Sequence, residues 1–163
     1  QGSIMPTPTY TLIDSVTLAS SASSVTFSSI SATGKGDLVL VGNFVCSTAN
    51  RINGNLNGDT GSNYSGVSME NDGGTTVSDL RTGAYFYAAA GRTTQATTII
   101  QIMNYANTTQ HKTILNRIDA SVDYTAGMAS RWANTAAVTS IALSTTNGTF
   151  SSGTFYLYQI VSE

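Results

Sequence analysis

The sequence contains little charge. Asp, Glu, Lys and Arg make up 10% of its 163 residues, against about 25% in typical globular domains. The seven basic residues are scattered along the chain, and the net charge is −2. Proteins that bind nucleic acid through its phosphates cluster their Lys and Arg residues. The sequence therefore predicts no nucleic-acid partner.

Cysteine and long apolar runs are scarce as well. The single cysteine, Cys46, cannot form an intrachain disulfide. It ends the apolar run Leu38–Cys46, so we expect a small buried side chain rather than a reactive thiol. No run approaches the roughly 18 apolar residues of a membrane-spanning helix. We expect no membrane insertion.

The first residues do not resemble a targeting segment. They lack the basic and apolar regions of a secretory signal. Gln1-Gly2-Ser3 resembles the remnant of a cleavable tag, and the natural start is expected near Met5. We therefore set residues 1–4 aside and expect residues 5–163 to form a single β-sandwich domain.

Short alternating apolar segments are abundant. Turn residues follow about every ten positions, and no segment has the sustained period of a long helix. This spacing predicts an all-β fold, a jelly-roll-like antiparallel β-sandwich of roughly nine or ten strands. The clearest strand candidates are Tyr10–Leu18, Ser24–Ile30, Asp37–Val45, Gly83–Ala90, Ala96–Tyr105, Lys112–Ile118, Val138–Leu143 and Phe155–Val161.

Some segments carry more specific expectations. In the first strand, Leu12, Val16 and Leu18 are predicted to line one buried rim. The region 53–66 is rich in turn signals, and Asn-Asp-Gly-Gly at 71–74 closes a short strand. The segment from Asp123 to Ser130 is ambiguous, and a short helical turn is one interpretation.

Catalytic chemistry has few candidate residues. The single histidine, His111, could act as a general base, but the sequence contains no G-x-S-x-G nucleophile motif for it to activate. Asp59, Glu70, Asp72 and Asp79 have no spacing that selects a glycosidase pair. We predict no enzyme activity, no catalytic residue and no cofactor.

A metal site is also not predicted. The run Asn53-x-Asn55-x-Asn57-Gly58-Asp59 is faintly similar to a calcium-binding loop. It has one carboxylate, and Tyr64 stands where such loops place a bidentate glutamate. No cluster of cysteine and histidine could hold zinc.

Aromatic and amide side chains are the remaining candidates for binding. Six aromatic residues could stack on sugar rings or, alternatively, pack half-buried in strands: Tyr64, Tyr85, Tyr87, Tyr124, Trp132 and Tyr156. Trp132 is expected in the core or at a subunit interface. The candidate ligand or partner residues are Asn57, Asp59, Asn63, Tyr64, His111 and Trp132, and the candidate loops are 53–65, 70–74 and 107–111.

Six sequence blocks together resemble a known family. They are SVTFSSI (24–30), DLVLV (37–41), NGDTGSNYS (57–65), NYANTTQHKTILNR (104–117), RWANTAAVTSIAL (131–143) and GTFYLYQIV (153–161). In this order they are similar to a β-sandwich module of virion proteins in tailed bacteriophages, especially marine and cyanobacterial phages. The chain departs from the family pattern at Ser31 and Gly34-Lys35, where proline and an aromatic are usual, and at Gln159, where glycine is usual.

The resemblance implies a non-enzymatic structural protein located on the virion, as a surface-exposed capsid decoration or a tail component. It implies a homo-oligomer, a trimer, with phage capsid or tail proteins as partners. It supplies no catalytic residues. The alternative is a tail-fibre module that recognises carbohydrate on the host surface. A glycan-degrading enzyme and an ice-binding protein are weaker alternatives, the latter because no regular Thr-x-Thr ladder is present.

Overall fold

The computed structural model describes residues 9–120 and 124–160, so residues 1–4, the expected tag remnant, lie outside the described part. All regular elements in these two ranges are strands. Their bounds are β1 Tyr10–Thr17, β2 Ser24–Phe27, β3 Asp37–Cys46, β4 Asn50–Leu56, β5 Tyr64–Asp72, β6 Thr75–Gly83, β7 Phe86–Gly91, β8 Ala96–Ile102, β9 Lys112–Ala120, β10 Tyr124–Trp132, β11 Ile141–Thr145 and β12 Phe150–Ile160. Within the described residues, no helix is long and apolar enough to cross a membrane.

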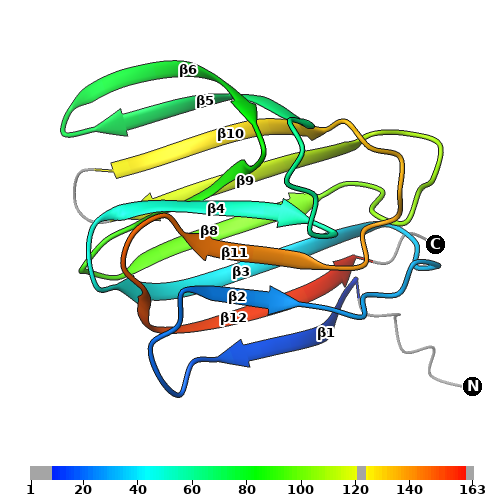
Figure 1. The fold of residues 1–163 in the computed structure, drawn as a ribbon, viewed down its shortest axis with the longest axis horizontal. Coiled ribbons are helices and arrows are strands. Elements are labelled where there is room, and N and C mark those ends of the chain that lie inside the picture. The colour runs from blue at the N-terminus through cyan, green and yellow to red at the C-terminus, as the bar shows by residue number, and fades with distance from the viewer. Residues whose placement is uncertain (1–8, 121–123, 161–163) are drawn as a thin grey trace, which may run out of the picture.

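The strands form two antiparallel sheets that face each other (Figure 1). The larger has the order β1-β12-β3-β8-β9-β10-β5-β6, and the smaller has the order β2-β11-β4-β7. The chain changes sheet at each step from β1 to β5, at both steps from β6 to β8, and at both steps from β10 to β12. This alternation is the connectivity of a jelly roll. The predicted fold class is confirmed, with twelve strands instead of nine or ten.

Four strands extend the larger sheet beyond the jelly-roll framework. β5 and β6 are inserted between β4 and β7, and β9 and β10 between β8 and β11. These four strands continue the larger sheet past β8, whereas the smaller sheet ends at β7. The β5–β6 hairpin is therefore one end of the larger sheet, and β6 is one of its two edge strands, with β1 the other.

The core lies between the sheets because alternate residues of each strand point inward. β8 and β9 alternate strictly between buried and less buried residues. The rings of Phe44, Phe150 and Phe155 pack with their centroids 5.3 to 5.7 Å apart. Cys46 is 1% exposed, and its burial in the core is confirmed. Burial raises the pKa of this thiol.

The expectation for Leu12 was wrong, and a β-bulge explains the error. Leu12 pairs with Tyr158, but the register shifts before Asp14 pairs with Leu157. The extra residue reverses the direction of the following side chains. Val16 therefore packs against the core, as predicted, together with Leu18, whereas Leu12 points outward and is 51% exposed.

Two further strands differ from the expectations. Residues 124–132 are β10, with strictly alternating burial, so the helical interpretation of 123–130 was wrong for its described part. β6 was not predicted because nearly all of its residues are exposed. It is defined by pairing with β5 around Gly73 and Gly74, whose φ values of 57° and 84° suit the tight two-residue turn expected there.

The turn-rich region is shorter than expected. Its first residues belong to strand β4, Asn50–Leu56. Within this strand, Asn53 and Gly54 pair with both β7 and β11. The turn itself covers residues 57–63. Similarly, β11 begins at Ile141, three residues later than the predicted strand start at Val138.

Candidate functional site

Five of the six candidate residues lie in the turn after β4 or directly beside it. The carboxylate of Asp59 accepts hydrogen bonds from Nε1 of Trp132 at 2.7 Å and from Nδ2 of Asn63 at 2.9 Å. The backbone N–H of Gly61 donates another at 2.9 Å. The bonds from Trp132 and Asn63 hold the pKa of the Asp59 carboxyl below its ordinary value. The protein itself thus satisfies this carboxylate.

The two aromatic candidates are parts of the core. The rings of Tyr64 and Trp132 stack with centroids 6.5 Å apart, and their exposed fractions are 2% and 0%. The Tyr64 hydroxyl accepts a hydrogen bond from the backbone N–H of Leu56 at 2.9 Å. Burial raises the pKa of Tyr64 to about 12. Neither ring has a face open to a sugar.

Asn57 fixes the turn to the segment before β11. Its φ of 54° is a left-handed conformation that asparagine tolerates. Its Oδ1 accepts hydrogen bonds from the backbone N–H groups of Thr139 at 2.7 Å and Ser140 at 3.1 Å. Its Nδ2 donates to the carbonyl of Ala137 at 2.7 Å. Asn57 therefore has a local structural role.

His111, the sixth candidate, is exposed in the connection before β9. The next residue, Lys112, is 1% exposed and was not singled out from the sequence. Its Nζ donates hydrogen bonds to three carbonyl oxygens, those of Asn107 at 2.6 Å, Gln110 at 2.9 Å and Thr135 at 3.2 Å. Burial lowers the pKa of this amine. Lys112 thereby joins the connection between β8 and β9 to the connection between β10 and β11.

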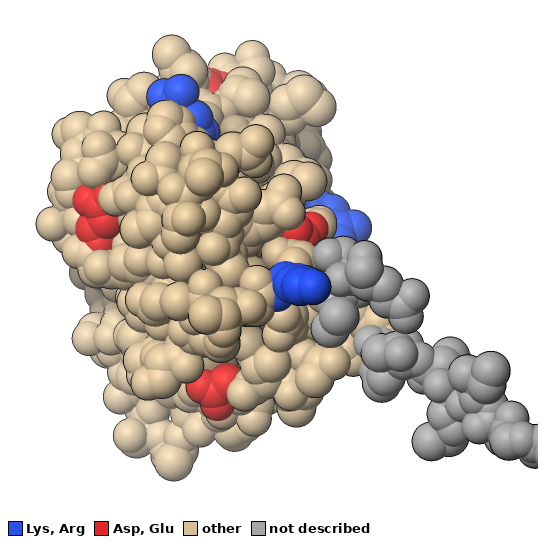
Figure 2. Space-filling model, turned by 90° about the vertical axis from the view of Figure 1, so that its right-hand side faces the viewer, with Lys and Arg blue, Asp and Glu red and all other residues tan. Residues whose placement is uncertain are grey.

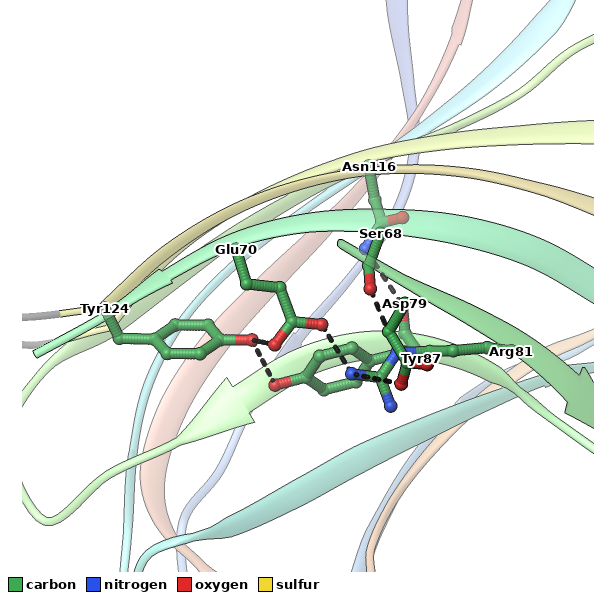
Figure 3. A network of polar contacts seen from close by, with 7 residues as sticks. All are labelled: Ser68, Glu70, Asp79, Arg81, Tyr87, Asn116 and Tyr124. Atoms are coloured by element: carbon green, nitrogen blue, oxygen red, sulfur yellow. Dashed lines mark hydrogen bonds and ion pairs between the residues drawn. The ribbon is translucent and has the colours of Figure 1, made fainter. Parts of the chain in front are cut away.

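A polar network lies on the inner face of the larger sheet beside β7 (Figure 3). Arg81 of β6 pairs with the carboxylate of Glu70 in β5. Its Nε donates to Oγ of Ser68 at 3.2 Å, and its Nη2 lies 3.6 Å from Oδ2 of Asp79. The network connects the two strands of the hairpin on the side that faces the interior.

Two tyrosines link this network to the rest of the sandwich. The hydroxyl of Tyr124 in β10 donates to Oε2 of Glu70 at 2.9 Å, and it lies 2.9 Å from the hydroxyl of Tyr87 in β7. The pKa of Tyr124 is raised, chiefly by burial and then by its contacts with Tyr87 and Glu70. Burial also acts to raise the pKa of Glu70, but hydrogen bonds from Ser68, Arg81 and Tyr124 outweigh it and lower that pKa. The ionised carboxylate, bonded to Arg81 and Tyr124, is a structural clamp that joins the hairpin to β10 and, through the Tyr124 hydroxyl, to β7.

A hollow of about 200 Å³ opens beside this network, between β4, β6 and β7. The guanidinium carbons of Arg51 and Arg81 lie 5.2 and 4.9 Å from the centroid of the Tyr87 ring. Tyr85, also in the lining, is 43% exposed, and Asn53 adds an amide. The Arg51 guanidinium, an open aromatic side chain and an amide suit a small polar ligand.

The outer face of the larger sheet carries a row of residues that are all apolar except Gln101, called the apolar row below. One residue from each of its eight strands lies directly beside the next, in the order Leu12, Tyr158, Val39, Gln101, Leu115, Ala129, Val67, Leu80. Leu12, Leu115, Val67 and Leu80 are 40 to 76% exposed. The sequence does not reveal this row because its members come from eight separate segments.

Charge is sparse on the surface as well as in the composition. Figure 2 shows a face of the molecule on which scattered charged side chains are separated by broad uncharged areas. The outward-facing charged residues of the larger sheet include Asp37, Arg117, Asp119 and Arg131, two of each sign. The sheet's outer face is therefore nearly neutral.

The calcium-loop arrangement is not present, because Asn53 and Asn55 lie in strand β4 and Asp59 is bonded to Trp132. In the described ranges, no group of three or more His, Cys, Asp and Glu side chains is arranged to hold a metal ion. Of the carboxylates considered for catalysis, Glu70 and Asp79 share Arg81, and Asp72 is exposed at the end of β5.

No protein-family model and no curated protein matches the chain. Among solved structures, the chain is similar to a crystal structure of exo-inulinase from Aspergillus awamori, with 11% sequence identity and a TM-score of 0.41. The alignment covers 93% of this chain and 29% of that one. The chain therefore spans less than a third of that protein.

Proposed function

We propose that this chain is a non-enzymatic structural protein of a tailed-bacteriophage virion, either a surface-exposed capsid decoration or a tail component. It forms a homotrimer and contacts phage capsid or tail proteins. The resemblance of six sequence blocks to a virion module supports this role. In the fold those blocks are mostly core strands and the turns between them, which is consistent with a scaffold.

The observation that carries the proposal is the apolar row on the outer face of the larger sheet. Met69, beside the row, is 69% exposed, and Leu80, at its end, is 76% exposed. Large contiguous apolar patches on soluble proteins mark surfaces that contact other molecules. A row that crosses all eight strands suits a lasting contact between proteins better than it suits a small ligand.

Antibody labelling of intact phage particles tests the location. Antibodies raised against the purified chain are expected to label the particle, across the head for a decoration protein or along the tail for a tail component. Antibody that has been absorbed with the purified chain is the control. If the antibody labels neither intact nor disrupted particles, the virion assignment is refuted.

The second candidate function is recognition of carbohydrate on the host surface, and the hollow beside Arg51 and Tyr85 favours it. Tyr64 and Trp132 are unsuitable test positions because both are buried. The informative variants are Tyr85→Ala and Arg51→Gln, both at exposed residues, measured on a glycan array. Binding that both variants abolish supports this function, and an array without any bound glycan contradicts it.

A further inference from the structure

We propose that copies of this chain contact one another through the outer face of the larger sheet, with the β5–β6 hairpin of one copy seated in a hollow on another. The inference rests on the proposed function, which includes a homo-oligomer. It adds the surface and the residues that make the contact.

The hairpin supplies the protruding half of the contact. Val67 and Met69 of β5 and Leu80 of β6 point outward and are 49%, 69% and 76% exposed. Val67 and Leu80 are direct cross-strand neighbours. β6 is an edge strand of the sheet, so the hairpin can reach a second molecule without moving any other strand.

The receiving half is a hollow of about 480 Å³ on the same face. Its lining includes Val39 of β3, Ile99 of β8 and Leu115 of β9. At its floor, Gly127 of β10 has no side chain, and an added Cβ would meet no atom within 4 Å. Tyr10, Gln101 and Arg117 also line it. The apolar part of the wall and the backbone floor suit leucine and methionine side chains.

The size and charge of the face favour a second copy as the occupant. Eight strands at spacings of about 4.8 Å and lengths of about 28 Å give a face of about 900 Å². A stable interface needs about 800 Å² from each partner. Asp37, Arg117, Asp119 and Arg131 are outward charged residues of the sheet, two of each sign. The hairpin of one copy can therefore enter the hollow of the next with little net charge between them.

Light scattering over a range of concentrations tests the contact with three variants. Leu80→Lys puts a charge on the protruding half, and Gly127→Gln fills the hollow without disturbing the strand. Both are expected to raise the concentration at which the oligomer forms by at least about tenfold. Tyr85→Lys, at an exposed apolar residue away from this face, is the control and should leave assembly unchanged. Thermal unfolding shows whether each variant is folded.

The outcomes are distinct. A single-chain mass for the wild type, or an unchanged oligomer in both Leu80→Lys and Gly127→Gln, overturns the inference. Equal dissociation of the Tyr85→Lys control also overturns it, because the effect would not be specific to the face. Loss of assembly in the two face variants alone supports it. Failure of the virion assignment is read separately, from antibody labelling of particles.

Discussion

Nε1 of Trp132 donates a 2.7 Å hydrogen bond to Oδ2 of Asp59, so the single tryptophan and the turn after β4 hold each other in place. Trp132 has no exposed surface. Asp59→Ala leaves the buried indole N–H without its partner, which costs about 1–3 kcal/mol. We expect the free energy of unfolding in urea to fall by this amount. Asp72→Ala, at an exposed turn, is the matched control, and an equal loss in both variants would contradict the structural role of Asp59.

The same contact predicts a dependence on pH. The pKa of Asp59 is lowered in the folded state, below the unfolded value of about 3.9. Its contribution to stability is therefore present above pH 4 and is lost as the pH falls through the folded-state pKa. Asp59→Asn lacks this titration. The difference in unfolding free energy between wild type and Asp59→Asn should shrink as the pH falls below about 4, and a constant difference would contradict this account.

Arg81 is expected to hold the β5–β6 hairpin against the sandwich. Its side chain and that of Glu70 are 21% and 11% exposed. Arg81→Met leaves a mostly buried carboxylate without its cation, at a cost of about 1–3 kcal/mol for this partly exposed pair. Hydrogen exchange should accelerate in β5 and β6 and stay unchanged in β3 and β8. Lys35→Met, at an exposed residue in the connection before β3, should leave exchange in the hairpin unchanged, and an equal effect would argue against the clamp.

Two glycines in strands should respond oppositely to the same substitution. A Cβ at Gly54 would lie 2.2 Å from Cζ of the buried Phe86 ring, whereas one at Gly127 would meet nothing within 4 Å. Gly54→Ala is therefore expected to destabilise the fold by about 1–3 kcal/mol through overpacking. Gly127→Ala should be neutral or stabilising by about 0.4–1 kcal/mol. Urea unfolding of both variants measures the contrast, and equal effects would contradict the described packing.

Much of the fold follows from local sequence patterns. Alternation in Val25 and Phe27 of β2 predicts the side that is buried, and both are in the core. The apolar run before Cys46 predicts β3, an interior strand of the larger sheet. β10 alternates equally well, but alanine, methionine and serine obscure the pattern because they are common outside strands.

The polar network and the outer row could not be predicted in this way. Arg81 meets Ser68 and Glu70 because Ser68 pairs with Asp79 and Gly66 with Arg81, and strand register sets that relation. Ser-x-Glu and Asp-x-Arg on either side of the Gly-Gly turn are the signal that could have indicated a hairpin with a polar face. Residues of the outer row lie far apart in the chain, so only the sheet order brings them together.

Disulfide trapping between copies tests the central claim, that hairpin and hollow meet across an interface. Leu80 and Leu115 lie three strands apart in one sheet, about 14 Å, so cysteines there cannot bond within one chain, which requires Cα atoms within about 7 Å. Cys46 is buried and does not compete. On mild oxidation, a chain with Leu80→Cys and Leu115→Cys is predicted to give covalently linked copies, with far less linkage in either single variant. If the double variant yields unlinked chains and no covalently linked copies, the claim is contradicted.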